Sequence, residues 1–174
     1  MGKPPFHPGD KVKEYVVEQE LNVGNMGAVY TIEKRDILLK APFIDSGKVL
    51  IEQFRKEVST LQTLAHQGIL GIIDHDLQSG VPWCSLERLP EGTLRRMLEQ
   101  RGKLSVVEAT RIVFYVAQAL GCGHTLEPSV LHRHLRPENI AFKNNRPILL
   151  DFGLASFGSS SGITLPPQAD ILYM

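Results

Sequence analysis

Residues that could hold a phosphate group recur in the first third of the chain. Gly24 and Gly27 lie in a turn between two alternating stretches, where glycines let backbone N–H groups approach a phosphate closely. Lys40 ends the following alternating stretch, where its ammonium group can reach phosphate oxygens, and Glu57 is a later carboxylate able to pair with it. Taken singly, the glycines also fit an ordinary turn, and the lysine and glutamate an ordinary surface ion pair.

Two further groups of polar residues occur late in the chain. Residues 132–139 read HRHLRPEN, and Asp151 is followed by Phe152 and Gly153. Together they supply imidazole, amide and carboxylate groups. Cys122 and His124, with the histidines of the HRH segment, also have the residue types of a zinc site, which is the alternative interpretation.

Alternation predicts strands in the first half of the chain, with a tight turn at Lys34 and Arg35. The predicted strands cover residues 15–21, 27–33, 36–40, 69–74 and 83–86. Between the third and fourth strands the spacing changes to three and four. One helix is therefore predicted there, with its apolar stripe at Ile51, Phe54, Val58, Leu61 and Ala65.

Helical spacing dominates the second half. Helices are predicted over 93–100 and 105–121, and the second opens with a capping box made by Ser105 and Glu108. Short apolar runs at 130–131, 140–142 and 147–150 are interpreted as loops, and the Gly-, Ser- and Pro-rich tail as a mobile segment.

This order of strands followed by helices predicts an α+β fold in two lobes. We expect a tail over 1–12, a small lobe over 13–86, a joint over 87–92 and a partial large lobe over 93–174. With 19 basic and 19 acidic residues, the chain has no net field to attract nucleic acid or an anionic membrane. Two cysteines and no long apolar run favour a cytoplasmic protein.

The glycine turn, Lys40, Glu57, the HRHLRPEN segment and the Asp-Phe-Gly triplet match, in order, the motifs of one family. On these motifs the chain resembles the protein kinases, from about Tyr15 onward, and within them the Ser/Thr branch of bacterial type. The resemblance implies a complete small lobe, built from an antiparallel sheet and one helix, and a large helical lobe.

The resemblance also implies roles for single residues. Lys40 would bind the α and β phosphates of ATP and pair with Glu57, while Asn139 and Asp151 would bind Mg²⁺. Leu86 occupies the gatekeeper position at the start of the hinge. The remaining nucleotide contacts would be Asn22, Gly24, Gly27, Val29, Leu38, Glu87, Leu89 and Ala141.

Four residues depart from the family pattern. His134 stands where the family has the aspartate that accepts the substrate's proton, so catalysis would be impaired. Asn22 replaces the first glycine of the loop. Leu38 replaces an alanine above the adenine and Ala141 a leucine below it, an exchange of volume that would keep the pocket but shift it.

The chain ends before the A-P-E motif, so the resemblance implies a truncated large lobe. The apolar side chains of the helix predicted over 105–121 would then be partly bare, including Ile112, Val113, Val116 and Leu120. Such a surface predicts a protein partner or self-association.

Three functions follow from these observations. The first is a regulatory pseudokinase that binds Mg-ATP without efficient transfer. The second is an active Ser/Thr kinase in which a substitute base or a partner chain completes the site. The third is a docking module that binds protein and no nucleotide.

Overall fold

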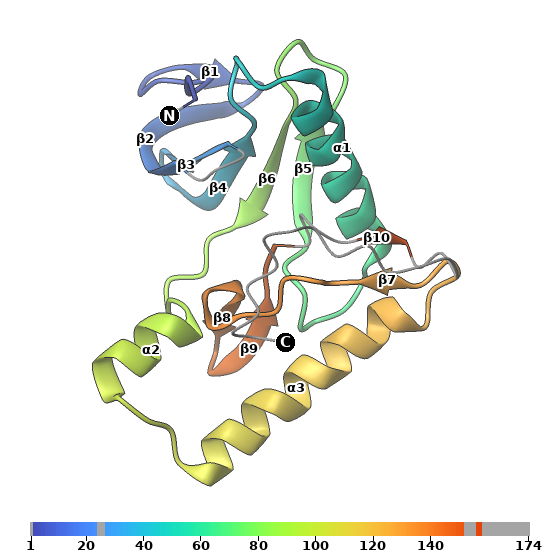
Figure 1. The fold of residues 1–174 in the computed structure, drawn as a ribbon. Helices are drawn as coiled ribbons and strands as arrows, with labels where there is room; N and C mark the ends of the chain where they lie inside the picture. The colour runs from blue at the N-terminus through green and yellow to red at the C-terminus, as the bar shows by residue number, and fades with distance from the viewer. Residues whose placement is uncertain (1, 24–26, 152–155, 158–174) are drawn as a thin grey trace. The chain divides into compact units, whose positions relative to one another are not determined.

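The chain divides into two compact units. The structure is a computed structural model that describes residues 2–23, 27–151 and 156–157 (Figure 1). The first unit comprises residues 1–62 and 71–88, and the second comprises residues 63–70 and 89–174. Each unit is described below by itself.

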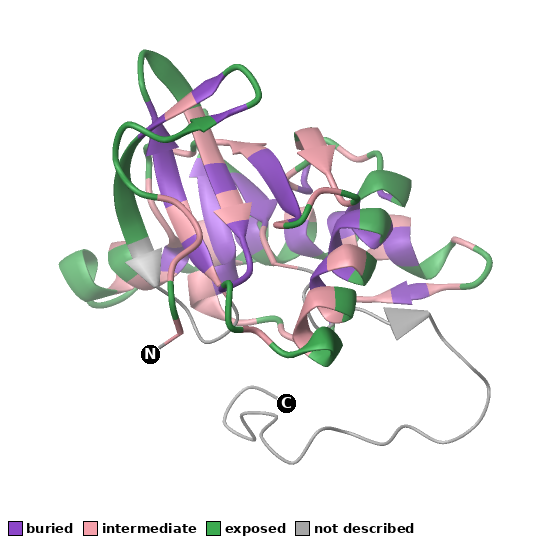
Figure 2. Cartoon of the chain, turned by 90° about the horizontal axis from the view of Figure 1, so that it is seen from above, coloured by how far each residue is buried: buried purple, intermediate pink, exposed green. Residues whose placement is uncertain are grey.

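A six-stranded antiparallel sheet forms the first unit, in the order β1-β2-β3-β4-β6-β5. Its alternating sequence places every second side chain in an apolar core, which Figure 2 shows as purple strands between exposed green turns. Tyr30 and Leu39 are completely buried there. The strands are β1 (Lys11–Val12), β2 (Tyr15–Val23), β3 (Ala28–Ile32), β4 (Arg35–Ala41), β5 (Ile72–Asp76) and β6 (Trp83–Glu87).

The helix of this unit is α1 (Lys48–Thr63). Phe54, Val58 and Leu61 of the predicted stripe are buried, and the first two form a second cluster with residues of the sheet. Ala65 was wrongly included in the stripe, since it lies beyond the end of the helix and is exposed. The sheet and α1 confirm the predicted small-lobe architecture.

Two predicted boundaries were wrong. The turn between β3 and β4 lies at Glu33 and Lys34, where Lys34 takes the positive φ of 57°, and Arg35 already begins β4. The predicted strand at 69–74 starts only at Ile72, because Ile69 forms a parallel bridge to Leu149 within the second unit. Apolar alternation alone did not reveal this second partner.

Two helices, α2 (Leu94–Arg101) and α3 (Val106–His124), begin at side-chain caps in the second unit. The Thr93 hydroxyl accepts a bond from the backbone N–H of Arg96. Ser105 and Glu108 form the predicted capping box, in which the Glu108 carboxylate accepts bonds from both the backbone N–H and the hydroxyl of Ser105. These bonds, with a contact to Arg101, lower the pKa of Glu108 to about 2.

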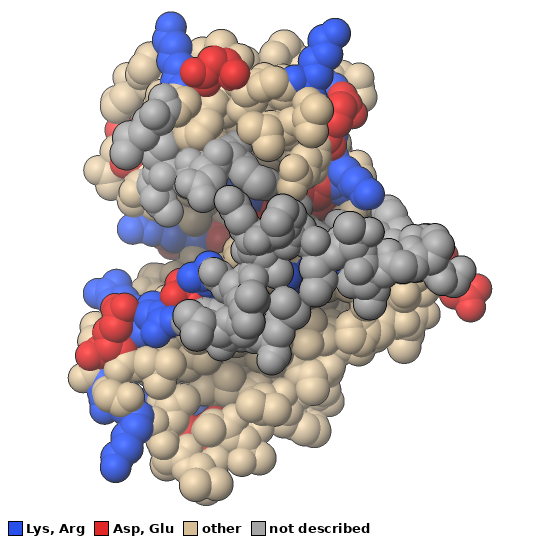
Figure 3. All heavy atoms as spheres, in the orientation of Figure 1, with Lys and Arg blue, Asp and Glu red and all other residues tan. Residues whose placement is uncertain are grey.

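The apolar face of α3 is partly buried and partly exposed. Ile112 and Val116 are buried, whereas Val113 is exposed. Figure 3 shows the surface over α3 as an area largely without charged side chains. The large apolar side chains exposed on this helix are Val106, Val107, Val113 and Phe114.

Three apolar runs predicted as loops are strands. The runs at 140–142 and 147–150 pair as an antiparallel hairpin of β8 (Ile140–Lys143) and β9 (Arg146–Leu149). Asn144 and Asn145 supply the two positive φ angles that its turn requires. Leu131 and Val130 form β7 (Val130–Leu131), which pairs with β10 (Ser156–Phe157).

Candidate functional site

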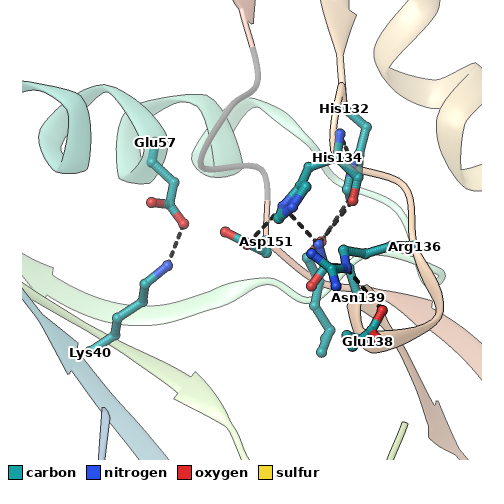
Figure 4. Close-up of polar contacts among 9 residues, drawn as sticks. Lys40, Glu57, His132, His134, Arg136, Glu138, Asn139 and Asp151 are labelled. Carbon is teal, nitrogen blue, oxygen red and sulfur yellow. Dashed lines mark hydrogen bonds and ion pairs between the residues drawn. The ribbon is translucent and has the colours of Figure 1, made fainter. Parts of the chain in front are cut away.

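Lys40 and Glu57 form a short ion pair in the first unit. The Lys40 Nζ lies 2.6 Å from Glu57 Oε1, and the glutamate side chain is only 3% exposed (Figure 4). β4 positions the lysine and the middle of α1 positions the glutamate. The ordinary surface ion pair considered from the sequence is therefore excluded by burial. Removing one partner of such a pair would leave an uncompensated charge inside the protein.

The register of the sheet groups several predicted nucleotide contacts on one face. Val29 pairs with Lys40, and Leu38 pairs with Leu86. Residues directly opposite one another in an antiparallel sheet share a face, as do alternate residues of one strand. Val29, Leu38, Lys40 and Leu86 therefore occupy the same face, and all four are half-buried.

Backbone packing requires a glycine at position 27. A Cβ atom placed there would lie 2.3 Å from the carbonyl oxygen of Ala41, on the neighbouring strand β4. Gly24 lies outside the described residues. Asn22 belongs to β2, but the structure does not describe its side chain. The phosphate-binding role predicted for this turn therefore stays a prediction.

His132 holds the loop of the second unit in place. Its Nδ1 accepts a bond of 3.2 Å from the backbone N–H of His134, so its Nε2 carries the proton and donates to the Leu150 carbonyl oxygen at 2.8 Å. Burial lowers its pKa, which favours this neutral form. The backbone N–H of Leu150 in turn donates to the Asn139 carbonyl oxygen. These bonds fix the backbone of Leu150, the residue directly before Asp151.

His134, Asn139 and Asp151 lie together in the same unit (Figure 4). The amide nitrogen of Asn139 donates to the backbone oxygen of His134 at 2.9 Å and lies 3.0 Å from its Nδ1. The same Nδ1 is 3.4 Å from Asp151 Oδ2. Asp151 has a φ of 55°, in the left-handed region. The structure thus brings together three residues that the sequence singled out separately.

Glu138 anchors the short 3₁₀ helix η1 (Pro137–Asn139) to α2. Its carboxylate accepts from Arg95 Nε at 2.7 Å and from Arg136 Nε at 2.9 Å. These arginines, Arg136 foremost, lower the pKa of Glu138 to about 2. Sequence reasoning missed Arg95, which belongs to no motif, and no pattern in the sequence linked it with Glu138. This anchor holds Asn139 at the end of η1.

Ala141 lies in β8 and is almost completely buried. It forms an isolated antiparallel bridge with Thr93. Leu89 and Glu87, the predicted hinge residues, are half-buried in the second and first units respectively.

The zinc alternative receives no support from the geometry. Both ring nitrogens of His132 are bonded to backbone atoms and cannot ligate a metal. Across residues 2–23, 27–151 and 156–157, no three histidine, cysteine, aspartate or glutamate side chains are grouped as metal ligands.

Comparison with known families decides the identity. A family profile described as "Protein kinase domain" matches residues 15–173. This chain belongs to the protein kinase family. The predicted family resemblance is thereby confirmed, and the α+β two-lobe architecture agrees with it.

Relatives of this kinase-family chain are serine/threonine-protein kinases, several of them bacterial. PknD of Mycobacterium tuberculosis is 30% identical over 163 residues, covering 90% of this chain and 24% of the relative. A probable serine/threonine-protein kinase of Clostridium acetobutylicum is 28% identical over 161 residues, covering 86% of this chain and 24% of the relative. PkaA of Streptomyces coelicolor is 26% identical over 172 residues, covering 87% and 31%. The kinase-family chain thus spans about a quarter to a third of the length of these relatives.

Two further properties bear on its surroundings. Among the residues that the structure describes, no helix is both long enough and apolar enough to cross a bilayer. On the face drawn in Figure 3, basic and acidic side chains are interspersed at the surface of each unit.

Proposed function

We propose that this chain is a Ser/Thr-type kinase-like domain that binds ATP with a divalent cation and transfers the phosphoryl group poorly, acting as a regulatory pseudokinase. The observation that carries the proposal is the environment of His134. In the family, the residue at this position accepts the proton of the substrate hydroxyl. Its environment here opposes that task.

The accepting nitrogen of the His134 imidazole is already occupied. The Asn139 amide nitrogen can only donate, and it is held on the His134 backbone oxygen, so His134 Nδ1 accepts from it and Nε2 carries the ring proton. A ring in this state offers substrate an N–H donor and no second acceptor. Losing a positioned general base typically costs about 10²- to 10⁴-fold in rate.

Nucleotide binding is supported by the retained family residues. Lys40, held by Glu57, would contact the α and β phosphates, and the face it shares with Leu38 and Leu86 would contact the adenine. Asn139 and Asp151 offer amide and carboxylate oxygens, which are suitable ligands for Mg²⁺. When bound, that cation would neutralise charge on the phosphates.

Two measurements test this proposal. Titration calorimetry with ATP and Mg²⁺ should show binding that weakens in Asp151→Asn and Lys40→Arg, which keep the size of one side chain and the charge of the other. Lys13→Arg, at an exposed ion pair with Asp74, is the matched control and should bind ATP normally. Absence of ATP binding in the unmodified chain would exclude the nucleotide-binding function and favour the docking module.

Phosphoryl transfer is measured separately, on a generic Ser/Thr protein substrate. The unmodified chain should transfer little, and His134→Asp should raise the rate. A rate typical of an ordinary kinase in the unmodified chain would refute the pseudokinase proposal and favour the active enzyme.

A regulatory role also needs a protein partner, which we expect at the exposed apolar residues of α3. Mass measurement in solution tests for self-association.

A further inference from the structure

A carboxylate from outside the β8–β9 hairpin holds the turn of that hairpin. Glu91 Oε1 accepts a bond of 2.5 Å from the backbone N–H of Asn144, and Glu91 Oε2 accepts one of 3.1 Å from that of Asn145. Glu91 lies 53 residues before Asn144 in the chain and belongs to the same unit. The hairpin ladder ends at the pair of Lys143 and Arg146, so the carboxylate supplies the acceptors for the two turn residues.

The turn needs this support because of its residue types. Asn144 and Asn145 have φ angles of 51° and 61°, in the left-handed region, where residues other than glycine are disfavoured. A two-residue turn of this kind is most stable as Asn-Gly, and here the second residue is also asparagine. By accepting from both backbone N–H groups, Glu91 stabilises the two residues in the conformation that the turn requires.

The residues after Glu91 run along β8. The Gly92 carbonyl oxygen accepts a bond of 3.1 Å from the backbone N–H of Phe142, and Thr93 forms the bridge with Ala141. Residues 91–93 therefore follow the strand from its turn to Ala141, one of the predicted nucleotide contacts. Glu91 holds the end of this contact that lies at the turn.

The opposite end of the hairpin carries the two predicted Mg²⁺ ligands. Asn139 directly precedes β8, and Asp151 follows β9 by two residues. The two chain segments are joined there by the bond of 2.9 Å from the Leu150 N–H to the Asn139 carbonyl oxygen. In a hairpin the turn sets the register, and a shift of one residue would turn each side chain to the other face.

We propose that Glu91 is a positioning residue of the candidate site. Its carboxylate holds the turn and thereby fixes the hairpin register in which Asn139, Ala141 and Asp151 are presented to ATP and its cation. This inference rests on the proposed function, because it concerns the same nucleotide site.

The first test compares two glutamates of the second unit in the whole chain. Glu91→Ala should weaken the binding of ATP with Mg²⁺, measured by calorimetry, by about 2- to 10-fold, the factor that one hydrogen bond typically contributes. Glu99→Ala, at an exposed glutamate of α2, is the matched control and should bind ATP like the parent.

A second change at the turn shows whether Glu91 acts through the hairpin. Asn145→Gly keeps the backbone N–H and creates the Asn-Gly turn, which needs no carboxylate to hold its conformation. The double variant Glu91→Ala, Asn145→Gly should therefore recover the ATP affinity of the parent, and Asn145→Gly alone should not weaken binding. A glutamate that contacted the nucleotide itself would not be replaced by a better turn.

The proposal is overturned if Glu91→Ala binds ATP like the parent, or if the double variant stays as weak as Glu91→Ala. Hydrogen exchange without nucleotide separates this inference from the proposed function. The amides of Phe142 and Leu150 should exchange faster in Glu91→Ala and at the parent rate in the double variant, whereas unchanged exchange in Glu91→Ala would refute the role of Glu91 alone. Absence of ATP binding in the unmodified chain would refute the proposed function, and hydrogen exchange would then decide whether Glu91 holds the hairpin.

Discussion

Removing Lys40 should destabilise the first unit strongly. Lys40→Met keeps the length of the side chain but leaves the Glu57 carboxylate, only 3% exposed, without its closest cation. Breaking a buried pair on one side typically costs about 3–5 kcal/mol in free energy of unfolding. Domains are usually stable by about 5–15 kcal/mol, so this loss would remove roughly a third of the free energy of unfolding.

Trp83 provides the assay. It is the chain's single tryptophan and is buried in the sheet of the same unit, so its fluorescence during urea denaturation reports the unfolding of this unit. The matched control is Lys13→Met, which breaks an equally short ion pair whose lysine is 54% exposed and should therefore change stability little.

The double variant Lys40→Met, Glu57→Met completes the test. Replacing both partners with apolar side chains of similar volume should recover most of the lost stability, because no buried charge remains. If Lys40→Met costs no more than the Lys13 control, the carboxylate is adequately solvated in the native state. That result would refute the inference that Lys40 stabilises a buried carboxylate at Glu57.

Three further predictions concern acid stability, packing and thiol reactivity. The native pKa of Glu138, lowered from 4.5 to about 2, means that its ion pairs stabilise the fold above pH ~4.5 and lose this effect as the pH falls toward 2. Glu138→Gln should therefore be less stable than the parent at pH 6 and equal to it near pH 2 in denaturation curves; a constant difference would contradict this. Gly27→Ala should destabilise the first unit, because its Cβ would lie 2.3 Å from a backbone oxygen of β4, whereas Gly71→Ala, with open space around it, should not; thermal unfolding compares the two. Burial raises the pKa of the Cys84 thiol to about 12, so an alkylating reagent at pH 8 should modify Cys122 in the native protein and Cys84 only after unfolding, as peptide mass mapping would show.

Local periodicity predicted the elements whose partners lie nearby in the sequence. The stripe of α1, the capping box of α3 and the meander of β2, β3 and β4 are all local patterns, and they match the predictions apart from Ala65 and the exact position of the β3–β4 turn. The start of β5 was wrong because Ile69 pairs with Leu149, a contact that spacing does not reveal. The hairpin of β8 and β9 was missed although Asn144 and Asn145 were its available turn signal.

For the candidate site, too, the sequence predicted one part and the structure was needed for the rest. Residue order alone singled out Lys40, Glu57, Asn139 and Asp151 as candidates, because the motifs contain them. Their burial and contacts needed the structure: the sequence does not say whether Lys40 meets Glu57 inside or outside the protein. For position 134 the sequence showed only that histidine replaces the family's aspartate. The contacts of His134 Nδ1 with Asn139 and Asp151 depend on the loop backbone, which His132 holds in place.

That support by His132 has a genetic consequence. The bonds that fix the loop run through the His132 ring and the backbone of Leu150, and through the backbone, not the side chain, of residue 134. A different side chain at position 134 therefore inherits the same backbone. Histidine and aspartate codons differ by one base, so a single nucleotide change could exchange the imidazole for a carboxylate without rebuilding the loop. A single mutation can thus replace the histidine with aspartate, and a single reverse mutation can restore it.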